Sequence, residues 1–506
     1  MAIAPLVPGA FRSTNAARYL LETRSQLYDL QRQIATGKKS ETYGGLGAQR
    51  ITSLDLRAKA SELKGYQATI VSFQIRTRQL DLGLTQLGKI GEDVRSSTIL
   101  PQFDVDSSGK TSFQKLSQLR FDEAVDVLNT EINGVRIFSG RSTNVRPVLD
   151  SNTLLNGDAA GRAGLKQFIS ERKAADFGVA PDVGRIVKGG AGTTATLAED
   201  GTHPFGFKLT AASSTTPAIT TTLTAGPPAN VSFNVAANPV ANDQVRVEVT
   251  LPDQTKKTLT LVAQNAPLTP PASAGAFEIG ATPAATATNL RAALAAALTT
   301  ESATSLPSAS AKAASNAFFA GSINNPPQRI SGPPATATAL VAGTPANSVI
   351  FYQGDDLAPS ARLSQQSRVD ASITVGVGAQ ANEEGIRRVL SNLGALISET
   401  FNPAIPADKG RYQELLDRVR GDLSQVNGVQ RVQDIQVEIA ASASTLKLAD
   451  DRHKTKLNFV DTIISEVEDA NQEETAARLL AVQTKLQASY QTTAIVSRLN
   501  LTDYLR

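Results

Sequence analysis

The sequence predicts a mainly α fold: long antiparallel coiled-coil helices formed by the two chain ends, short β-hairpins in a helical rod, and an inserted β-rich (α+β) outer domain. Three observations predict it. Apolar residues recur at helical spacing near both ends of the 506-residue chain, alternating segments follow further inward on each side, and the middle has a different composition. This order is palindromic, so we expect the two ends to pair while the middle projects away.

Composition narrows the function before any motif is considered. The chain is 41% apolar and carries a net charge of only +3, so it can bury ordinary cores and lacks the basic surplus typical of nucleic-acid-binding domains. It has no Cys and only two His, the residues on which zinc sites, thiol catalysis and most general-base catalysis depend. We therefore expect no enzyme, no cofactor and no metal site.

The first element expected is a helix near the N-terminus. Its apolar stripe consists of Leu20, Leu27, Leu30 and Ile34. The Gly37-Lys38 pair that follows matches part of a phosphate-binding loop, but such a loop needs Ser or Thr after the Lys and a strand before the glycines. Lys39 stands at that position and a helix precedes it. We therefore interpret the glycines of 37–47 as the turn between two helices.

A long rod helix is expected at 52–98, because two columns of apolar residues persist over five heptads. The seam formed by these columns includes Leu56, Leu63, Ile70, Phe73, Leu80, Leu84 and Leu87. Pro101 is expected to end this helix, because proline cannot continue the ladder of backbone hydrogen bonds.

Two shorter elements are expected next in the rod. A helix is predicted at 112–133, with inward positions at Leu116, Leu119, Val125 and Leu128. The segment 135–148 alternates between apolar and polar residues, with Gly140 and Asn144 near its centre. It therefore predicts a hairpin of two short strands.

The middle of the chain is rich in Ala, Thr, Pro, Ser and Gly and has few charges. Such a composition is typical of disorder. However, 245–251 and 258–262 alternate as paired strands do, and the Ala-rich run 287–300 favours a helix. We therefore predict a folded insertion with loose Ala/Pro linkers.

The C-terminal part mirrors the N-terminal part. Strand-like segments are expected at 351–356 and 371–377. Helices are expected at 383–399, 411–426, 429–471 and 473–499. The candidate interface residues of the last helix are Leu479, Val482, Leu486, Tyr490, Leu499 and Leu501. No neighbouring sequence covers the stripes at the two chain ends, so we expect them to pack against each other and then against other subunits.

These elements divide the chain into three expected domains. The inner domain of terminal helices comprises 1–40 and 465–506. The helical rod domain with β-hairpins comprises 41–180 and 350–464, and the inserted variable outer domain comprises 181–349.

Several segments at both ends resemble the flagellin superfamily. Near the N-terminus the helix ending in Ala35-Thr-Gly-Lys-Lys39 is similar to a helix of that family that ends in a Thr/Ser-Gly-Lys turn. Near the C-terminus the similar segments are 464–471, 484–493 and 499–505. The segments 136–140 and 352–355 are similar to strands of the family's rod domain. The resemblance covers about 13–180 and 350–506, and it departs at 43–47, where the family often has an acidic pair with Pro or Ala.

The resemblance implies a structural component of the bacterial flagellum. The ending 500–505 is more similar to the members that join hook to filament, and the alternative is a major filament subunit. The implied location is outside the cell, after export through the growing flagellum without a cleavable signal peptide. The implied partners are further copies of the chain, a neighbouring hook-associated protein, flagellin, the export apparatus, and a chaperone on the C-terminal helix. Nucleic acid and membrane insertion are not implied.

Remaining polar residues have simpler interpretations than a site. His203 and His453 are expected to be surface or capping residues, because neither belongs to a ligand-spaced cluster. Asp450, Asp451 and Asp461 alternate with Lys and Arg on an expected helix, which is typical of a solvated face. The segment 352–356 is expected to be a turn.

Overall fold

The computed structural model describes residues 8–99, 102–425 and 428–503, and the chain divides into two compact units. One, here called the end unit, contains the chain as far as Ser72, the short segment Arg368–Ile373, and the chain from Leu446 onward. The other, the central unit, contains Phe73–Ser367 and Thr374–Thr445. The fold is a mixture of α-helices with several small sheets that are mostly antiparallel.

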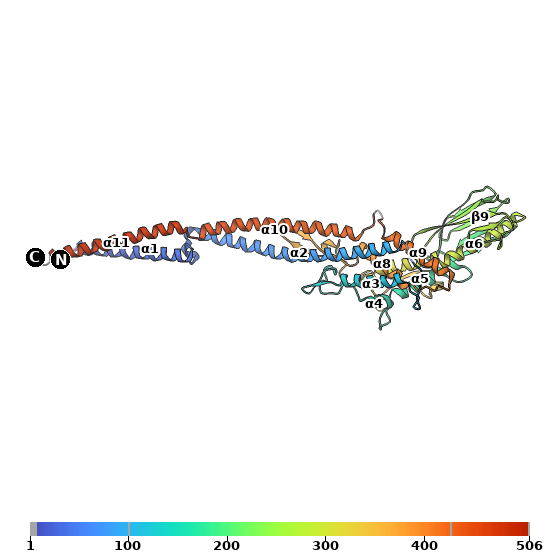
Figure 1. Cartoon of the computed structure of the whole chain (residues 1–506), viewed down its shortest axis with the longest axis horizontal. Coiled ribbons are helices and arrows are strands. Elements are labelled where there is room, and N and C mark those ends of the chain that lie inside the picture. The colour runs from blue at the N-terminus through green and yellow to red at the C-terminus, as the bar shows by residue number, and fades with distance from the viewer. Residues whose placement is uncertain (1–7, 100–101, 426–427, 504–506) are drawn as a thin grey trace, which may run out of the picture. The chain divides into compact units, whose positions relative to one another are not determined.

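The end unit is built from long helices. Its elements are α1 (Pro8–Thr36), the 3-10 helix η1 (Tyr43–Gln49), the first part of α2 (Arg50–Ser97), the last part of α10 (Val432–Glu468), and α11 (Gln472–Asp503). Helix α1 packs along α11, so the start of α1 and the end of α11 lie together (Figure 1). Within this unit α2 packs on α10 through a small cluster around Leu63 and Val460.

The central unit contains a helical core. Its helices are the rest of α2 and α10 together with α3 (Ser112–Leu128), α4 (Ser151–Asn156), α5 (Leu165–Phe177), α7 (Ser305–Phe319), α8 (Glu384–Ser398) and α9 (Pro406–Leu423). Aromatic rings fill its centre, where Phe319 meets Phe121, Phe318 and Phe351 edge to face. Helix α3 begins with a capping box, because Thr111 and Gln114 each accept a hydrogen bond from the other's backbone N–H.

Short two-stranded sheets lie beside these helices. They pair β1 (Glu131–Ile132) with β2 (Val135–Arg136), β11 (Gln328–Ile330) with β12 (Leu340–Ala342), and β13 (Gln366–Arg368) with β14 (Thr374–Gly376). The same unit contains the short 3-10 helices η2 (Val183–Arg185), η3 (Pro334–Thr336) and η4 (Arg362–Ser364).

A β-module occupies the middle of the chain. One sheet has the order β3 (Ile186–Gly189), β4 (Thr194–Glu199), β7 (Asn230–Val235), β6 (Ile219–Thr224). The other has the order β10 (Ala276–Glu278), β9 (Lys256–Gln264), β8 (Gln244–Thr250), β5 (Lys208–Ser214). Among the strand pairs described in these two sheets, β9–β10 alone is parallel. Helix α6 (Pro283–Ala303) contacts strands of both sheets, and their alternating apolar residues form one core with it.

The insertion is therefore folded, as predicted, and β8 pairs with β9 where the alternating segments stand. The C-terminal boundary of this folded insertion does not coincide with the position at which the amino-acid composition changes. Helix α7 contributes Leu306 and Ala309 to the core of the β-module, but Phe318 and Phe319 belong to the helical core. A Cβ built on Gly184 would lie 3.6 Å from the Leu306 side chain, so the chain leaves and rejoins the helical core at neighbouring points.

Two local predictions were wrong. The hairpin in the rod turns at Asn133-Gly134, not near Gly140, because both residues have positive φ and so form the turn type that closes tight hairpins. In α3, Leu116 and Leu119 are exposed. Val125 and Leu128 are buried as predicted, and the buried face continues through Ser117, Phe121 and Ala124 in place of the two leucines.

A pair of deletions tests this border. Replacing 186–303 by a short Gly/Ser linker should leave the helical core folded, because Gly184 and Leu306 are already neighbours. Extending the deletion to 181–347 also removes Phe318 and Phe319, and truncating one buried Phe alone costs about 3–5 kcal/mol. We expect a much lower melting temperature for the longer deletion, followed by circular dichroism. Equal melting temperatures would contradict the assignment of α7 to the helical core.

Candidate assembly surface

The predicted stripes of α1 and α11 lie on two helices that pack together. All four predicted residues of α1 are half-buried, as are Leu479, Val482 and Leu486 on α11. Tyr490 is an exception, because about half of it (48%) is exposed. The side chains of Leu499 and Leu501 lie outside the described residues.

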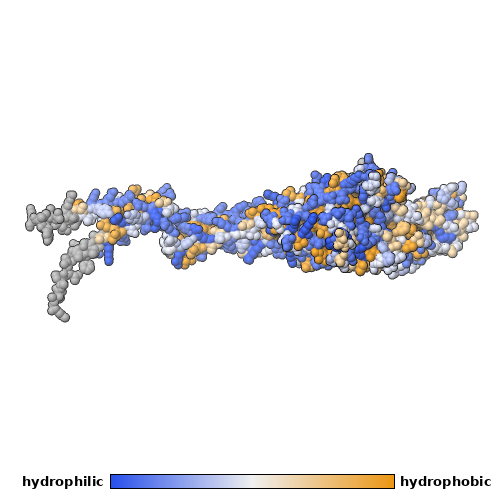
Figure 2. Space-filling model, turned by 90° about the horizontal axis from the view of Figure 1, so that it is seen from below, coloured by the Kyte–Doolittle hydropathy of each residue, from blue (hydrophilic) through white to orange (hydrophobic). Residues whose placement is uncertain are grey.

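Pairing leaves much apolar surface of these two helices uncovered. No apolar side chain described on α1 or α11 is fully buried. The large exposed ones are Tyr19, Leu21, Tyr28, Leu480, Tyr490 and Ile495. Figure 2 shows hydrophobic residues among hydrophilic ones on the visible face of the terminal helices. Exposed apolar residues at this density on a two-helix pair are typical of a surface that another chain covers.

The Gly-Lys turn after α1 is fastened to the break between α10 and α11. The N–H of Ala470 donates to the Gly37 carbonyl at 2.9 Å, and the N–H of Lys39 donates to the Glu468 carbonyl at 2.8 Å. Gly37 has φ of +69°, the left-handed conformation in which glycine commonly ends a helix. The Lys39 ammonium donates to the carbonyls of Glu466 and Val467 at the end of α10. The sequence indicated a turn between two consecutive helices; the attachment of this turn to the break between α10 and α11 was not predicted.

Side chains strengthen this joint. Lys38 forms an ion pair with Asp469 at 2.5 Å. Glu468 accepts hydrogen bonds from Nε and Nη2 of Arg57, at 2.7 and 2.6 Å, and from the Ser53 hydroxyl at 2.6 Å. The Arg57 hydrogen bond is the main reason that the pKa of the Glu468 carboxyl falls from 4.5 to about 2. Sequence reasoning missed Glu468 as a site residue, although it lies in the segment 464–471 that the sequence analysis singled out.

The predicted seam of the long helix is buried over most of its length. Leu63, Ile70, Leu80, Leu84 and Leu87 are buried, and Leu56 and Phe73 are half-buried. In the end unit, Leu56 and Leu63 pack with α10. In the central unit, Leu80, Leu84 and Leu87 belong to the helical core.

The expectation of surface histidines was wrong. His203 is buried and interacts with Asp200, Arg185 and Phe205. Burial is the largest cause that lowers its pKa. His453 is also buried, because a segment distant in sequence covers it.

The predicted solvated acidic face is only partly present. Asp450 is buried and paired with Lys454 at 2.6 Å, whereas Asp451 and Asp461 are exposed. Tyr352 in the expected turn is fully buried, and burial raises its pKa. Its hydroxyl donates to the Asp355 carbonyl at 3.2 Å, which closes the segment locally.

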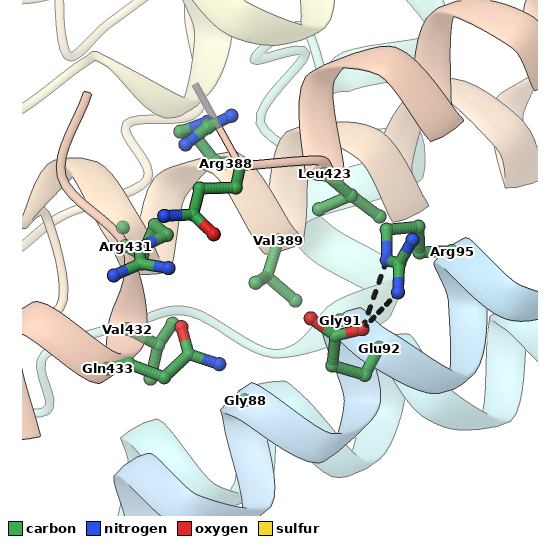
Figure 3. Close-up of a pocket in the computed structure, with 12 residues that line it drawn as sticks. Gly88, Gly91, Glu92, Arg95, Arg388, Val389, Leu423, Arg431, Val432 and Gln433 are labelled. Carbon is green, nitrogen blue, oxygen red and sulfur yellow. Dashed lines mark hydrogen bonds and ion pairs between the residues drawn. The ribbon is translucent and has the colours of Figure 1, made fainter. Parts of the chain in front are cut away.

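A pocket of about 300 Å³ in the central unit is the other candidate for a site. Figure 3 shows Arg95 bonded to Glu92 on one side, with Arg431 and Gln433 opposite. Arg431 is in turn paired with Asp434 at 2.9 Å. Since these arginines already have carboxylate partners, the pocket offers little unpaired charge to a ligand.

The described parts of the chain contain no group of His, Cys, Asp or Glu placed to hold a metal ion. Among the described helices, none combines the length and apolar character needed to cross a membrane. Comparison with protein-family models and with curated proteins finds no match to this chain. The uncovered helix pair therefore remains the best candidate for a functional surface.

Replacing Glu468 with Gln tests the joint. The change removes the charge that Arg57 and Ser53 surround, and losing charge-assisted bonds to a buried group costs about 1–3 kcal/mol. Hydrogen exchange should therefore speed up around the start of α2 and the end of α10. Glu466→Gln is the matched control, because the Glu466 side chain is exposed and should leave exchange unchanged. Equal exchange in both variants would show that the carboxylate does not fasten the helices.

The lowered pKa of Glu468 predicts that the stability of the end unit depends on pH. Because the folded pKa of Glu468 lies near 2, below its ordinary 4.5, its contribution is complete above pH 4.5 and is lost as pH falls toward about 2. Over that range, the free energy for opening the end unit should fall less steeply in Glu468→Gln than in the wild type. Amide exchange of the end unit at several pH values, corrected for intrinsic rates, measures this difference. Parallel curves would contradict it.

Proposed function

We propose that this chain is a structural subunit of the bacterial flagellum, belongs to the flagellin superfamily, and joins hook to filament. Within that superfamily it is most like hook-associated protein 3. The observation that carries the proposal is the pairing of α1 with α11 from opposite ends of the chain, with large apolar side chains still exposed on both. Of the segments similar to the superfamily, 484–493 lies in α11, and 35–39 and 464–471 meet at the joint beside the two helices.

Its mechanism is self-assembly. The terminal helices form an antiparallel coiled-coil layer on the inside of a tubular structure, and neighbouring copies cover the exposed residues Leu21, Tyr28 and Leu480. Burying one large apolar side chain contributes about 1.5–3 kcal/mol, so a few such residues in each copy suffice to drive association. The rod contacts neighbours along the tube, and the β-module faces outward.

The remaining assignments follow from this role. In this role the chain leaves the cell through the growing flagellum. Its partners are copies of itself, a neighbouring hook-associated protein, flagellin and the export apparatus. A chaperone that covers the exposed apolar residues of α11 before export would keep copies from associating in the cell.

The alternative is a filament flagellin, which would use the same terminal helices. The two roles differ in abundance and position. Immunogold labelling of intact flagella should mark one band at the hook end for a junction subunit, and the whole length for a filament subunit. Mass analysis of sheared flagella gives a second test, because a junction subunit is scarce there. Absence of the chain from flagella would contradict both roles.

Leu480→Asp tests the assembly surface. Leu480 is 63% exposed, so the change should hardly alter the stability of the monomer. In the assembly, the same carboxylate would be buried against a neighbour at a cost of several kcal/mol for each subunit. We expect the variant to be exported and recovered from the medium, with its melting temperature unchanged, but absent from flagella.

Val240→Asp is the matched control, because Val240 is 73% exposed and lies in the β-module. We expect this variant to be incorporated as the wild type is. Normal incorporation of Leu480→Asp would exclude this face of α11 from the contact between subunits.

A further inference from the structure

Helix α7 in the central unit carries a deeply buried lysine. Lys312 is 3% exposed, and lysine is rarely buried to this extent unless it is paired. Its Nζ atom lies 2.7 Å from Asp422 Oδ2 of α9, 2.7 Å from Asn316 Oδ1 of α7, and 3.2 Å from the Ser391 hydroxyl of α8. Burial is the main cause of the lowered pKa of Lys312, so this amine gives up a proton more readily than an exposed lysine does. A buried amine of this kind is a potential nucleophile.

The side-chain amide of Asn316 is within reach of this nucleophile. Since Nζ of Lys312 lies 2.7 Å from Oδ1 and a C=O bond is about 1.23 Å long, Nζ lies at most about 3.9 Å from the amide carbon Cγ. Groups held about 3–3.5 Å apart gain greatly in rate from their proximity, so only a small movement is needed. The two residues stand four apart on α7, where side chains are neighbours, so an amide bond between them is compatible with the helix.

Asp422 is placed to carry the protons of such a reaction. Its Oδ2 can accept a proton from the Lys312 ammonium, which frees the lone pair of the nitrogen for attack. The side-chain amide of Asn392 donates to the same oxygen at 2.7 Å and holds the carboxylate in position. A pocket of about 370 Å³ is lined by Lys312, Asn316 and Asp422, and Asn316 itself is exposed. A small leaving group released at Asn316 therefore has a path to solvent.

We propose that Lys312 and Asn316 join spontaneously in an amide bond that braces α7. The Lys312 nitrogen attacks Cγ of Asn316, so the Nζ–Cγ bond forms and the Cγ–Nδ2 bond breaks. Asp422 carries two protons, one after the other, from Nζ to the departing nitrogen, which leaves as ammonium, and the carboxylate is regenerated. The reaction consumes no oxidant, reductant or other co-reactant. This inference does not depend on the flagellar role.

The bond closes a covalent ring on the helix that contributes to both cores of the central unit. Helix α7 provides Leu306 and Ala309 to the core of the β-module, and Phe318 and Phe319 to the helical core. The chain contains no Cys, so no disulfide within it can brace this helix. An amide bond restrains the helix covalently whatever the redox conditions around the protein.

Tryptic mapping of the purified full chain by mass spectrometry tests the bond. Trypsin needs the charged lysine side chain, so the unmodified chain gives the separate peptides 292–312 and 313–329. We expect one peptide, 292–329, lighter than its sequence mass by one ammonia, with fragment ions that connect Lys312 to Asn316. A cyclic imide at an asparagine also loses ammonia, but it leaves Lys312 open to trypsin. Two separate peptides would overturn the proposal, as would a cross-link from Lys312 to Asp422 formed with loss of water.

Three variants identify the groups that react. Asn316→Ala removes the amide at an exposed helical position, where alanine favours the fold, and should give the two separate peptides. Asp422→Asn removes the proton carrier and should slow bond formation about 100-fold or more, measured as the fraction of 292–329 over time in protein that circular dichroism shows to be folded. Asp417→Asn is the matched control, because Asp417 is exposed on the same helix, and it should react as the wild type does.

Two results would contradict these assignments. One is a peptide 292–329 that lacks ammonia in Asn316→Ala, which would place the reacting amide elsewhere. The other is a folded Asp422→Asn variant that forms the bond as fast as Asp417→Asn, which would exclude Asp422 as the proton carrier.

Discussion

A pair of helices covers only the one face that each presents to the other, so the rest of each helix stays exposed unless a further element packs on it. The terminal helices α1 and α11 follow this constraint, and none of their described apolar residues is fully buried. Where more elements meet, burial becomes complete, as for Leu84 and Phe121 in the helical core. The α1–α11 pair is thus the described part of the chain with the least internal cover. In the role proposed above, association with other copies would supply stability that this pair does not gain from a core of its own.

The sequence predicts this chain best where structure depends on neighbours in the sequence. The long helix α2 and its seam follow directly from heptad spacing, because the same face recurs whatever it packs against. Predictions that depended on distant partners were less successful. His453 was expected at the surface, but the Val369 carbonyl that covers it lies 84 residues away. Leu119 was expected inward because its spacing fits a helical face, yet the buried face includes the polar residues Gln114 and Ser117.

The same distinction between local spacing and distant contacts explains which residues of the candidate site could be predicted. Stripe residues such as Leu27 and Leu486 could be predicted from periodicity, whereas Glu468 could not be recognised as a fastening residue. Its partner Arg57 lies 411 residues earlier, and no pattern within one segment identifies such a pair. The boundary of the insertion predicted from composition is wrong for a related reason. Helix α7 is Ala- and Ser-rich like the insertion, but Phe318 and Phe319 at its end fill the helical core.

The joint at Gly37 also fixes the register of the two chain ends. The Lys39–Glu468 and Ala470–Gly37 bonds form a short antiparallel bridge between backbone atoms, centred on Lys38 and Asp469. Sliding one terminal helix past the other by a single turn, about 5.4 Å, would break both bonds and separate Lys38 from Asp469. The joint therefore resists shear along the helix pair, whereas the side chains of the stripes, being similar from turn to turn, would allow it. A force along the axis of one terminal helix would therefore be transmitted through the joint to the other, without a change in their register.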